Sequence, residues 1–364
     1  MLHGPLRWRV GDQSGGWPPP HSKALRAKWG MILTMDFRSD NTHGCSTAII
    51  DALLRANRGT MTSYGDDAIT ARLRERCCEL FACEVEVFPV LTGTAANALA
   101  IASMTASDGR IVCHHDAHIH LEELGASEFF SGGAQLVPVN GASGKLHPDG
   151  VAAAGAFTCL SITQATEAGT LYRIEEVSAL AAIAHARGAG VHMDGARFAN
   201  AVAALGCAPA DLTWRAGVDV LSFGATKNGA MGAEMIVVFR QDLAVPLARL
   251  WHRSGHRLSK SRFLSAQLEA YLTDDLWLTN ARHANAAAAR LAEGIHDHLE
   301  ILRTVEVNVL FIRMHADQAA ALRAQGFDFY DWELFGTGAR RLVTAFDSTD
   351  AEIDALIAAV QRSG

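Results

Sequence analysis

The sequence lacks an apolar run long enough to cross a membrane, which takes roughly 18 to 20 consecutive apolar residues. It also lacks a basic surplus, since 32 lysines and arginines stand against 39 aspartates and glutamates, for a formal net charge of −7. Nucleic-acid phosphates are bound by basic faces, so this balance argues against DNA or RNA as a partner. We therefore predict neither a membrane protein nor a nucleic-acid-binding protein.

The sequence also lacks the cysteine pattern of a disulfide framework or a zinc ribbon. The chain has seven cysteines, an odd number, and no two of them have the spacing of a zinc ribbon. In a chain of 364 residues this pattern indicates free thiols in a reducing compartment. We therefore predict a cytoplasmic protein.

The first 35 residues have no pattern of a folded element. The segment 11–20 (GDQSGGWPPP) is turn-rich, and the continuous apolar stretch of a signal peptide is absent. We interpret residues 1–35 as a disordered leader or a misassigned start, with Met31 or Met35 as the alternative first residue. The remaining length fits one large domain and a smaller one.

From Asp36 onward, short apolar strands alternate with helical segments. The predicted strands are 85–91, 110–115, 134–139, 157–163, 190–194, 218–223 and 234–239. The predicted helices include 69–81, a segment from 92 to 104, and 177–188 with Gly188 as its C-cap. This alternation is typical of an α/β fold with a mostly parallel central sheet flanked by helices.

The pattern changes after about residue 245. A long helical region is predicted over 243–296, followed by a strand over 305–314, a helix over 316–325 and a strand over 341–346. A capping box at Thr349 and Glu352 opens the last helix. We therefore predict a large domain over 36–245 and a smaller C-terminal α/β domain over 246–364.

Three features follow predicted strands, where ligands bind in α/β sheets. The first is Gly93-Thr94, which opens a helix after the strand 85–91. Glycine lets a ligand approach the backbone, and the free N–H groups of a helix N-terminus bind anions such as phosphate. A threonine-capped helix without any ligand is the alternative interpretation.

The second and third features are Asp194 and Lys227, each at the end of an apolar strand. A carboxylate at such a place needs a partner, and a protonated pyridine nitrogen is a suitable one. A lysine amine held against a sheet is poorly solvated and becomes nucleophilic. A helix-capping aspartate and a solvent-facing lysine are the alternatives. Taken together, the three features match the phosphate, ring nitrogen and aldehyde of pyridoxal 5'-phosphate (PLP).

The sequence also resembles a known family, through motifs that occur in the family's order. They are RSDNTHG (38–44), TSYGDD (62–67), TGTAAN (92–97), DAHIH (116–120), HMDGARFANA (192–201), FGATKNG (223–229), LSKSRFLSAQ (258–267) and RLVTAFD (341–347). The family is that of the low-specificity L-threonine aldolases, PLP enzymes of fold-type I in the aspartate-aminotransferase superfamily. The resemblance implies cleavage of L-threonine or L-allo-threonine to glycine and acetaldehyde, in a dimer or tetramer with its active site at the subunit boundary.

The resemblance also implies a role for each matching residue. Lys227 is implied as the Schiff-base lysine, Asp194 as the partner of the ring nitrogen, and His118 as the group that stacks on the ring and takes part in catalysis. The other implied cofactor contacts are Gly93, Thr94, Arg197 and, more weakly, Lys260. The implied substrate contacts are Ser39, Tyr64, Arg197 and Arg341, with arginine suited to a carboxylate because its fork meets both oxygens.

One segment departs from the family pattern. Many members carry a histidine in an ENTHN-like segment after the strand 157–163, whereas this chain reads SITQATEAG, with Glu167 near the matching place. A histidine base from that segment is not available here. His118 therefore becomes the main candidate for the proton acceptor, and Gln164 or Thr166 is expected to shape the pocket.

Other functions stay open at this point. The same fold supports PLP-dependent β-elimination, transamination or a phenylserine-type aldol cleavage, because a fold does not decide which bond breaks. A PLP-binding regulator without enzymatic activity is a further alternative. The cluster HHDAHIHLEE (114–123) offers transition-metal ligands and suggests a metal-dependent hydrolase as a distant alternative.

Overall fold

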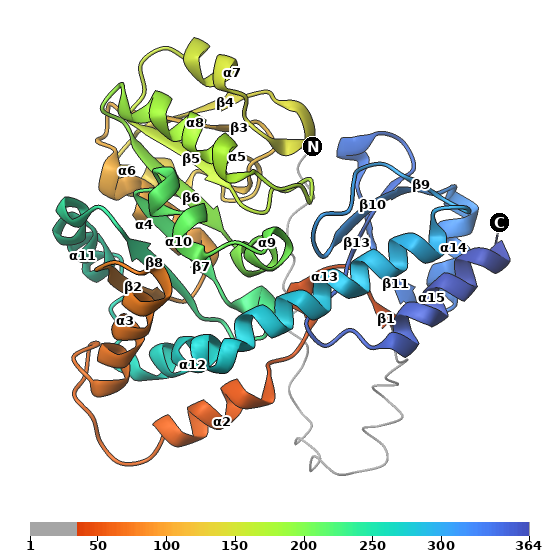
Figure 1. Cartoon of the computed structure of the whole chain (residues 1–364), viewed down its shortest axis with the longest axis horizontal. Coiled ribbons are helices and arrows are strands. Elements are labelled where there is room, and N and C mark those ends of the chain that lie inside the picture. The colour runs from red at the N-terminus through yellow and green to blue at the C-terminus, as the bar shows by residue number, and fades with distance from the viewer. Residues whose placement is uncertain (1–34, 364) are drawn as a thin grey trace, which may run out of the picture.

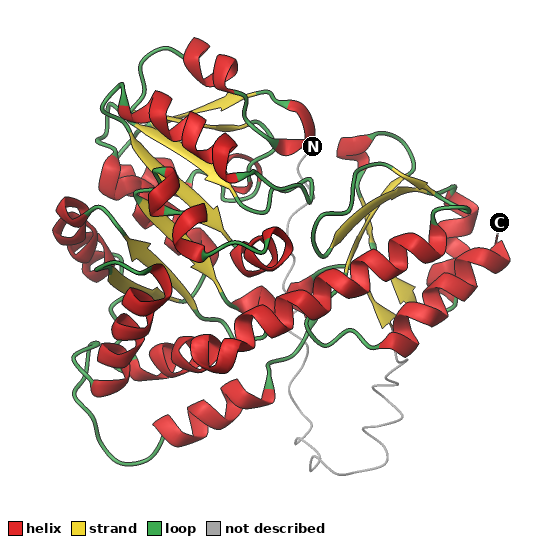
Figure 2. Cartoon of the chain, viewed as in Figure 1, coloured by secondary structure: helices red, strands yellow, loops and turns green. Residues whose placement is uncertain are grey.

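The computed structural model describes residues 35–363, so the predicted leader lies outside the described residues except for Met35. Within the described part the chain forms a large seven-stranded sheet and a smaller four-stranded sheet, each with helices packed on it (Figures 1 and 2). None of the helices in this part is both long and apolar enough to cross a membrane.

The large sheet has the strand order β2-β8-β7-β6-β5-β3-β4. Its strands are β2 (Glu86–Val90), β3 (Arg110–His114), β4 (Gln135–Val139), β5 (Cys159–Thr163), β6 (Gly190–Gly195), β7 (Val220–Gly224) and β8 (Glu234–Val238). β8 runs antiparallel to both of its neighbours, β2 and β7, and all other strand pairs of this sheet are parallel. The predicted α/β class with a mostly parallel central sheet is therefore confirmed.

Helices cover both faces of this sheet. One face packs against α4 (Gly93–Met104) and α11 (Ala244–Arg253), and α6 (Ala126–Ser131) lies against α4. The other face packs against α3 (Ala68–Phe81), α8 (Ile174–His185), α9 (Phe198–Leu205) and α10 (Pro209–Leu212). Two short helices, α5 (His118–Leu121) and α7 (Pro148–Ala153), connect strands at the rim.

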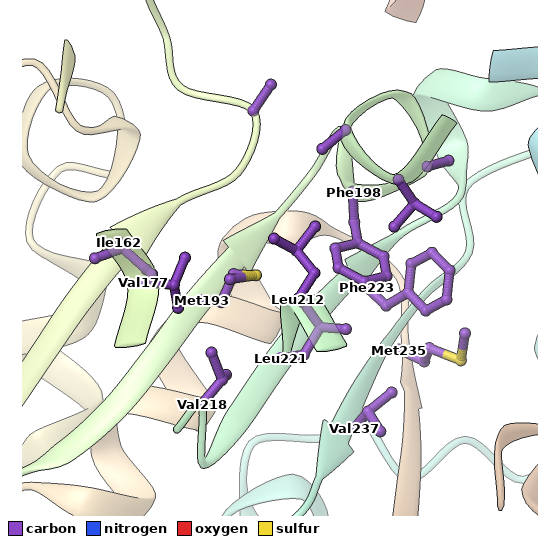
Figure 3. Packing of buried hydrophobic residues seen from close by; sticks show 14 of the residues in the cluster. Ile162, Val177, Met193, Phe198, Leu212, Val218, Leu221, Phe223, Met235 and Val237 are labelled. Atoms are coloured by element: carbon purple, nitrogen blue, oxygen red, sulfur yellow. The ribbon is translucent and has the colours of Figure 1, made fainter. Parts of the chain in front are cut away.

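Alternation along the strands explains this two-sided burial. In β7, Leu221 and Phe223 pack into the core with α9 and α10, whereas Val220 packs into the core on the α4 face. Figure 3 shows the first of these cores, with Phe198 of α9 and Leu212 of α10 lying over Leu221 and Phe223. Because both faces are buried, the strands read as continuous apolar runs.

The small sheet has the order β12-β13-β10-β9 and is antiparallel throughout. Its strands are β9 (Glu300–Ile301), β10 (Val309–Arg313), β12 (Tyr330–Asp331) and β13 (Ala339–Val343), with α14 (Ala316–Ala324) and α15 (Asp350–Ser363) packed nearby. The N-terminal strand β1 (Met35–Asp36) pairs with β11 (Phe327–Asp328), so the start of the described chain lies against this small lobe.

The helical region predicted over 243–296 is confirmed, although it is not one continuous helix. The structure has three helices there, α11, α12 (Arg262–Leu272) and α13 (Leu276–Ile295), separated by a loop at 254–261 and a kink near Asp274, whose φ is +51°. The longest of them, α13, contributes Trp277 and Ala281 to the large core and Leu291 to the small one. The helix α13 therefore packs against both lobes (Figure 1).

The predicted capping box is present at the start of α15. The backbone N–H of Thr349 donates to Glu352 Oε2 at 2.8 Å, and the N–H of Glu352 donates to Thr349 Oγ1 at 3.3 Å. The predicted C-cap Gly188 is not the cap itself: α8 ends at His185 with Ala186 as C-cap, and Gly188 lies in the turn that follows, with a φ of +72°. The domain limits 36–245 and 246–364 stay a prediction.

Candidate active site

The three predicted cofactor features meet at one edge of the large sheet. Asp194 lies at the end of β6, and Lys227 lies in the short 3-10 helix η4 (Thr226–Asn228) directly after β7. These two strands are neighbours, with Asp194 opposite Ser222 in the register. The N-terminus of α4 follows β2 at the same edge. The crossover between β6 and β7 thus places the carboxylate and the amine side by side.

Two adjoining cavities open at this edge. The inner cavity, of about 270 Å³, is lined by Gly93 and Thr94 of α4 together with Asp194, Ser222 and Glu234. The outer cavity, of about 490 Å³, is lined by Ser39, Glu167, Arg197 and Arg341, and by aromatic side chains of the small lobe. The residues that line both cavities are Asn41, His118 and Lys227. The lysine therefore stands where the two spaces join.

The inner cavity offers an anion site at the N-terminus of α4. The side chain of Thr92 caps the helix by accepting the N–H of Ala95 at 3.1 Å. The N–H groups of Gly93 and Thr94 precede the first intrahelical hydrogen bonds, so they are free to meet a ligand. A Cβ built on Gly93 meets no atom within 4 Å, so the space above this turn is open.

Asp194 is buried, with 4% of its surface exposed, and is held rigidly. Its Oδ1 accepts the backbone N–H of Ala196 at 2.9 Å, and its Oδ2 accepts Asn97 Nδ2 at 2.8 Å. A carboxylate oxygen accepts more than one hydrogen bond, so Asp194 keeps capacity for a cationic N–H in the cavity. The cavity thus combines an anion cradle, a buried carboxylate and an amine, which fits the phosphate, ring nitrogen and aldehyde of PLP.

Arg197 is paired with Asp40, a carboxylate for which the sequence predicts no role. Its Nε and Nη2 donate to Asp40 Oδ2 and Oδ1 at 2.8 and 2.9 Å, in a bidentate pair. Burial alone would raise the pKa of Asp40, but the charges of Arg197 and Lys227 keep that pKa below its usual value. Asn308 also donates to Asp40 Oδ2, at 3.1 Å. The pair therefore joins the N-terminal segment to both lobes at the cavity wall.

Arg341 is the arginine with donors left over. Its Nη2 donates to the carbonyl oxygen of Arg38 at 3.2 Å, and its Nε is buried without a partner among the described residues. The guanidinium lies 4.3 Å from the centre of the Trp332 ring and 5.3 Å from that of Tyr330. Burial, with Arg197 nearby, lowers the pKa of Arg341 to about 10. A desolvated guanidinium of this kind suits a carboxylate ligand.

His118 is held by two glutamates. Its backbone N–H donates to Glu167 Oε1 at 2.7 Å, and its Nδ1 lies 2.9 Å from Glu123 Oε1. The hydrogen bond to Glu123 raises the pKa of His118 above its usual value. Burial raises the pKa of Glu167 to about 7, and the negative charge of Asp194 adds to this shift.

Glu167 thus lies in the wall of the outer cavity, whereas Gln164 and Thr166 do not. Gln164 is fully buried and exchanges two hydrogen bonds with the backbone of Tyr172, at 2.9 and 3.0 Å. Thr166 is bonded to Thr170 at 2.7 Å. The prediction that Gln164 or Thr166 shapes the pocket is therefore wrong. Both side chains form hydrogen bonds within the turn that contains Glu167, so neither lines the cavity.

Two predicted site residues lie outside both cavities. Tyr64 is 49% exposed and has a φ of +61°, and its N–H donates to the carbonyl oxygen of Ser259 at 3.1 Å. Lys260 is the next residue after Ser259 and is exposed. The fold brings Tyr64 and Lys260 next to each other, but not to the Lys227 site of the same chain.

The histidine-rich segment 114–123 does not gather its side chains around one point. His114 bonds to the carbonyl oxygen of Gly141, His120 to that of His115, and His118 to Glu123. Among residues 35–363, no group of three or more histidine, cysteine, aspartate or glutamate side chains is arranged to hold a metal ion.

Several residues near the site carry functional groups for which the sequence motifs predict no role. Asp40 lies in RSDNTHG and Asn97 in TGTAAN, one helical turn after Gly93, so its position on the cavity side of α4 follows from helical spacing. For Glu123 the sequence suggests only the role of a metal ligand. Glu234, which begins β8, had no signal beyond its charge at the start of an apolar strand.

Glu234 is a buried carboxyl in the inner cavity. Its Oε2 accepts the backbone N–H of Ala225 at 2.8 Å, close to Lys227. It lies opposite Val90 and Gly224 in the sheet register, between the α4 turn and the lysine loop. Burial raises the pKa of Glu234 to about 7.

This shift predicts a pH dependence of stability. A carboxyl whose pKa is raised in the folded state binds a proton more tightly there than in the unfolded chain, so its stabilisation is lost as the pH rises from about 4.5 to about 7. We expect the free energy of unfolding of the cofactor-free protein, relative to Glu234→Gln, to fall by about 3 kcal/mol over this range. Urea titrations at several pH values measure this difference. The exposed Glu75→Gln serves as control, and a difference that is constant with pH contradicts the prediction.

Comparison with known proteins gives consistent matches. Residues 36–317 match the model of the family described as beta-eliminating lyase. The chain is 41% identical over 330 residues to a low specificity L-threonine aldolase of Pseudomonas aeruginosa, covering 88% of this chain and 94% of that protein. A second aldolase of the same description, from a Pseudomonas species, is 39% identical over 90% of this chain and 97% of its own length.

Solved structures agree with these matches. A threonine aldolase of Leishmania major superposes with a TM-score of 0.85 at 25% identity, over 90% of this chain and 98% of that one. An aspartate aminotransferase of Rhodobacter sphaeroides has a TM-score of 0.68 at 19% identity, over 91% of this chain and 92% of that one, and shows the shared fold alone.

Proposed function

This chain belongs to the low-specificity L-threonine aldolases among the beta-eliminating lyases, and we propose that it cleaves L-threonine and related β-hydroxy-α-amino acids to glycine and an aldehyde. It is a PLP-dependent lyase of fold-type I. The observation that carries the proposal is the pair of adjoining cavities, with Gly93, Thr94 and Asp194 lining the inner one, Ser39 and Arg341 lining the outer one, and Lys227 and His118 lining both.

The inner cavity would hold the cofactor. Gly93 and Thr94 would bind the phosphate, Asp194 the ring nitrogen and Lys227 the aldehyde carbon, while His118 would lie against the ring. When bound, the cofactor supplies an electron sink that stabilises negative charge at the substrate Cα. The role of Asp194 is to keep the ring nitrogen protonated, because a buried carboxylate favours a cationic partner.

The outer cavity would orient the substrate. Arg341, whose guanidinium has unused donors, and Ser39 would bind the carboxylate. Arg197 is already paired with Asp40, so its contribution is a fixed positive charge at the cavity wall rather than a free fork. Holding the carboxylate at this place determines which bond at Cα is presented for cleavage, which is the positioning that an enzyme supplies.

The proton of the β-hydroxyl would pass to His118. This imidazole lines both cavities, and its Nδ1 is taken by Glu123, so its Nε2 is the atom available to the substrate. Glu167, near the place where the family resemblance implies a histidine, would act by fixing the backbone of His118. A general base of this kind contributes a factor of about 10² to 10⁴ in rate.

We propose an assembly of at least two chains, a dimer or a tetramer, in the cytoplasm. Tyr64 and Lys260 lie together, exposed and away from the Lys227 site of their own chain, which supports a role for both in the active site of a neighbouring subunit. The seven cysteines, all within residues 35–363, carry free thiols, as is usual in a reducing compartment.

The function is tested by incubating the PLP-loaded protein with L-threonine and following acetaldehyde through a coupled alcohol dehydrogenase. We expect acetaldehyde and glycine in equal amounts. A protein that carries the Schiff-base absorption band but releases no aldehyde would contradict the proposal. Release of ammonia and a keto acid instead would favour β-elimination, and cleavage of phenylserine alone would favour an aldolase for bulkier substrates.

A further inference from the structure

A continuous chain of hydrogen bonds joins the ring-nitrogen carboxylate to the histidine of the substrate cavity. Asn97 Nδ2 donates to Asp194 Oδ2 and to Glu123 Oε1, each at 2.8 Å. The same Glu123 oxygen lies 2.9 Å from His118 Nδ1. The four residues come from β6, from α4 and from the segment around α5, so the fold rather than the sequence order assembles them.

The middle of this chain is removed from solvent. Asn97 is 2% exposed, and the side chain of Glu123 is fully buried. An amide NH₂ group has two hydrogens, and here each is given to a carboxylate. The reverse orientation would put the amide oxygen against two carboxylates, so the direction of every bond is determined. The remaining oxygens of the two middle residues, Asn97 Oδ1 and Glu123 Oε2, are buried without a partner among the described residues.

This direction also determines the tautomer of the imidazole. An ionised Glu123 only accepts hydrogen bonds, so His118 Nδ1 must carry a proton, and in the neutral imidazole Nε2 then keeps its lone pair. Glu167 fixes the same residue from the other side through its backbone N–H. His118 is thereby held at two points, and the residue lines both cavities.

We propose that Asn97 and Glu123 are positioning residues for the cleavage reaction: Glu123 holds His118 as a base with Nε2 free, and Asn97 ties that base to the carboxylate that serves the cofactor ring. This proposal rests on the proposed function for its kinetic consequences, but the tautomer it requires does not depend on any activity. The charged and titratable groups that face His118 are Glu123, Asp194, Lys227 and Glu167.

The kinetic test uses Glu123→Gln, which keeps an amide oxygen at the same place and removes the charge. Without the negative partner the pKa of His118 falls, so we expect the acid limb of the pH profile of kcat/KM to move down by about one pH unit. A weaker base also lowers kcat, by about tenfold or more. Cofactor content should stay at the wild-type level, because Glu123 does not line the inner cavity.

Asn97→Ala tests the link to Asp194. We expect a lower kcat and, in addition, a shift in the pH at which the cofactor absorption band titrates, because Asp194 loses its side-chain donor. The matched control is Asn200→Ala. Asn200 lies in α9, on the face of the sheet opposite α4; it is 3% exposed and its side chain is hydrogen-bonded to Asn285 of α13. This control should leave both pH dependences unchanged.

The structural test reads the tautomer directly in the wild-type holoenzyme. Long-range ¹H–¹⁵N spectra of protein labelled at histidine, with His118→Gln to identify the signal, should show a neutral imidazole protonated at Nδ1. A proton on Nε2, or a pH profile of Glu123→Gln that superposes on that of the wild type, would overturn the proposal. If the wild type releases no aldehyde, the proposed function fails. The spectra of His118 still test the positioning role separately, because they do not depend on activity.

Discussion

Lys227→Ala is expected to lose the visible absorption band of the lysine–cofactor Schiff base and to release no acetaldehyde above the level of free cofactor in buffer. Three lysines occur in the described residues, at positions 145, 227 and 260, and only Lys227 lines the two cavities. We therefore propose that its amine holds the cofactor and is exchanged for the substrate amine. An alanine at 227 removes both functions and leaves the sheet edge intact.

Absorption spectra between 300 and 500 nm and the coupled aldehyde assay measure this effect on the purified variant, and mass spectrometry after borohydride reduction locates the modified lysine in the wild type. Lys145→Ala is the matched control, because Lys145 is paired with Glu176 and lies outside both cavities. An unchanged band in Lys227→Ala, or a reduced adduct on another lysine, would show that the cofactor site is assigned wrongly.

Asp194→Asn should keep part of the cofactor and lose most of the turnover. The amide keeps the shape of the carboxylate but no longer stabilises a protonated ring nitrogen, so the electron sink is weakened. Breaking a buried ion pair costs roughly 3 to 5 kcal/mol, which, if lost in the transition state, corresponds to a fall of about 10² to 5 × 10³ in kcat. The proposed phosphate site at the N-terminus of α4 is untouched, which is why binding should persist.

Turnover with L-threonine and cofactor content after alkaline release are the two measurements for this variant. The control is Asp211→Asn, which removes a carboxylate of a surface pair with Arg215. Wild-type turnover in Asp194→Asn would mean that the ring nitrogen is bound elsewhere. A complete loss of cofactor together with activity would mean that Asp194 serves binding rather than the chemistry.

The α/β class and the position of the cofactor features could be predicted because their signals are local. Apolar strands buried on both faces read as continuous runs, so the strand before Asp194 and the strand before Lys227 were visible in the sequence. Gly93 and Thr94, which follow β2, likewise indicate a helix N-terminus from neighbouring residues alone. In a parallel sheet such features share one edge, which is why three separate motifs could be placed in one site.

The pairing of arginines and carboxylates could not be predicted. Arg197 and Arg341 both looked like carboxylate receptors, yet Asp40, which is remote in sequence, occupies the fork of Arg197 and leaves Arg341 with free donors. Likewise the sequence suggests that Gln164 lines the pocket, but its side chain is hydrogen-bonded to the backbone of Tyr172 instead. Each outcome depends on which polar groups become buried together, because a buried group must find a partner.

The sequence by itself thus determined the fold class, the sheet edge that carries the site, and the lysine, aspartate and helix N-terminus that suit PLP, because strand and helix signals are read from neighbouring residues. Only the tertiary structure decided how His118 is held, since Asn97, Glu123 and Asp194 come from three elements whose side chains meet only after the sheet and α4 have packed. Hydrogen bonds a few ångströms long connect residues that are far apart in the chain, and no local pattern records such a meeting.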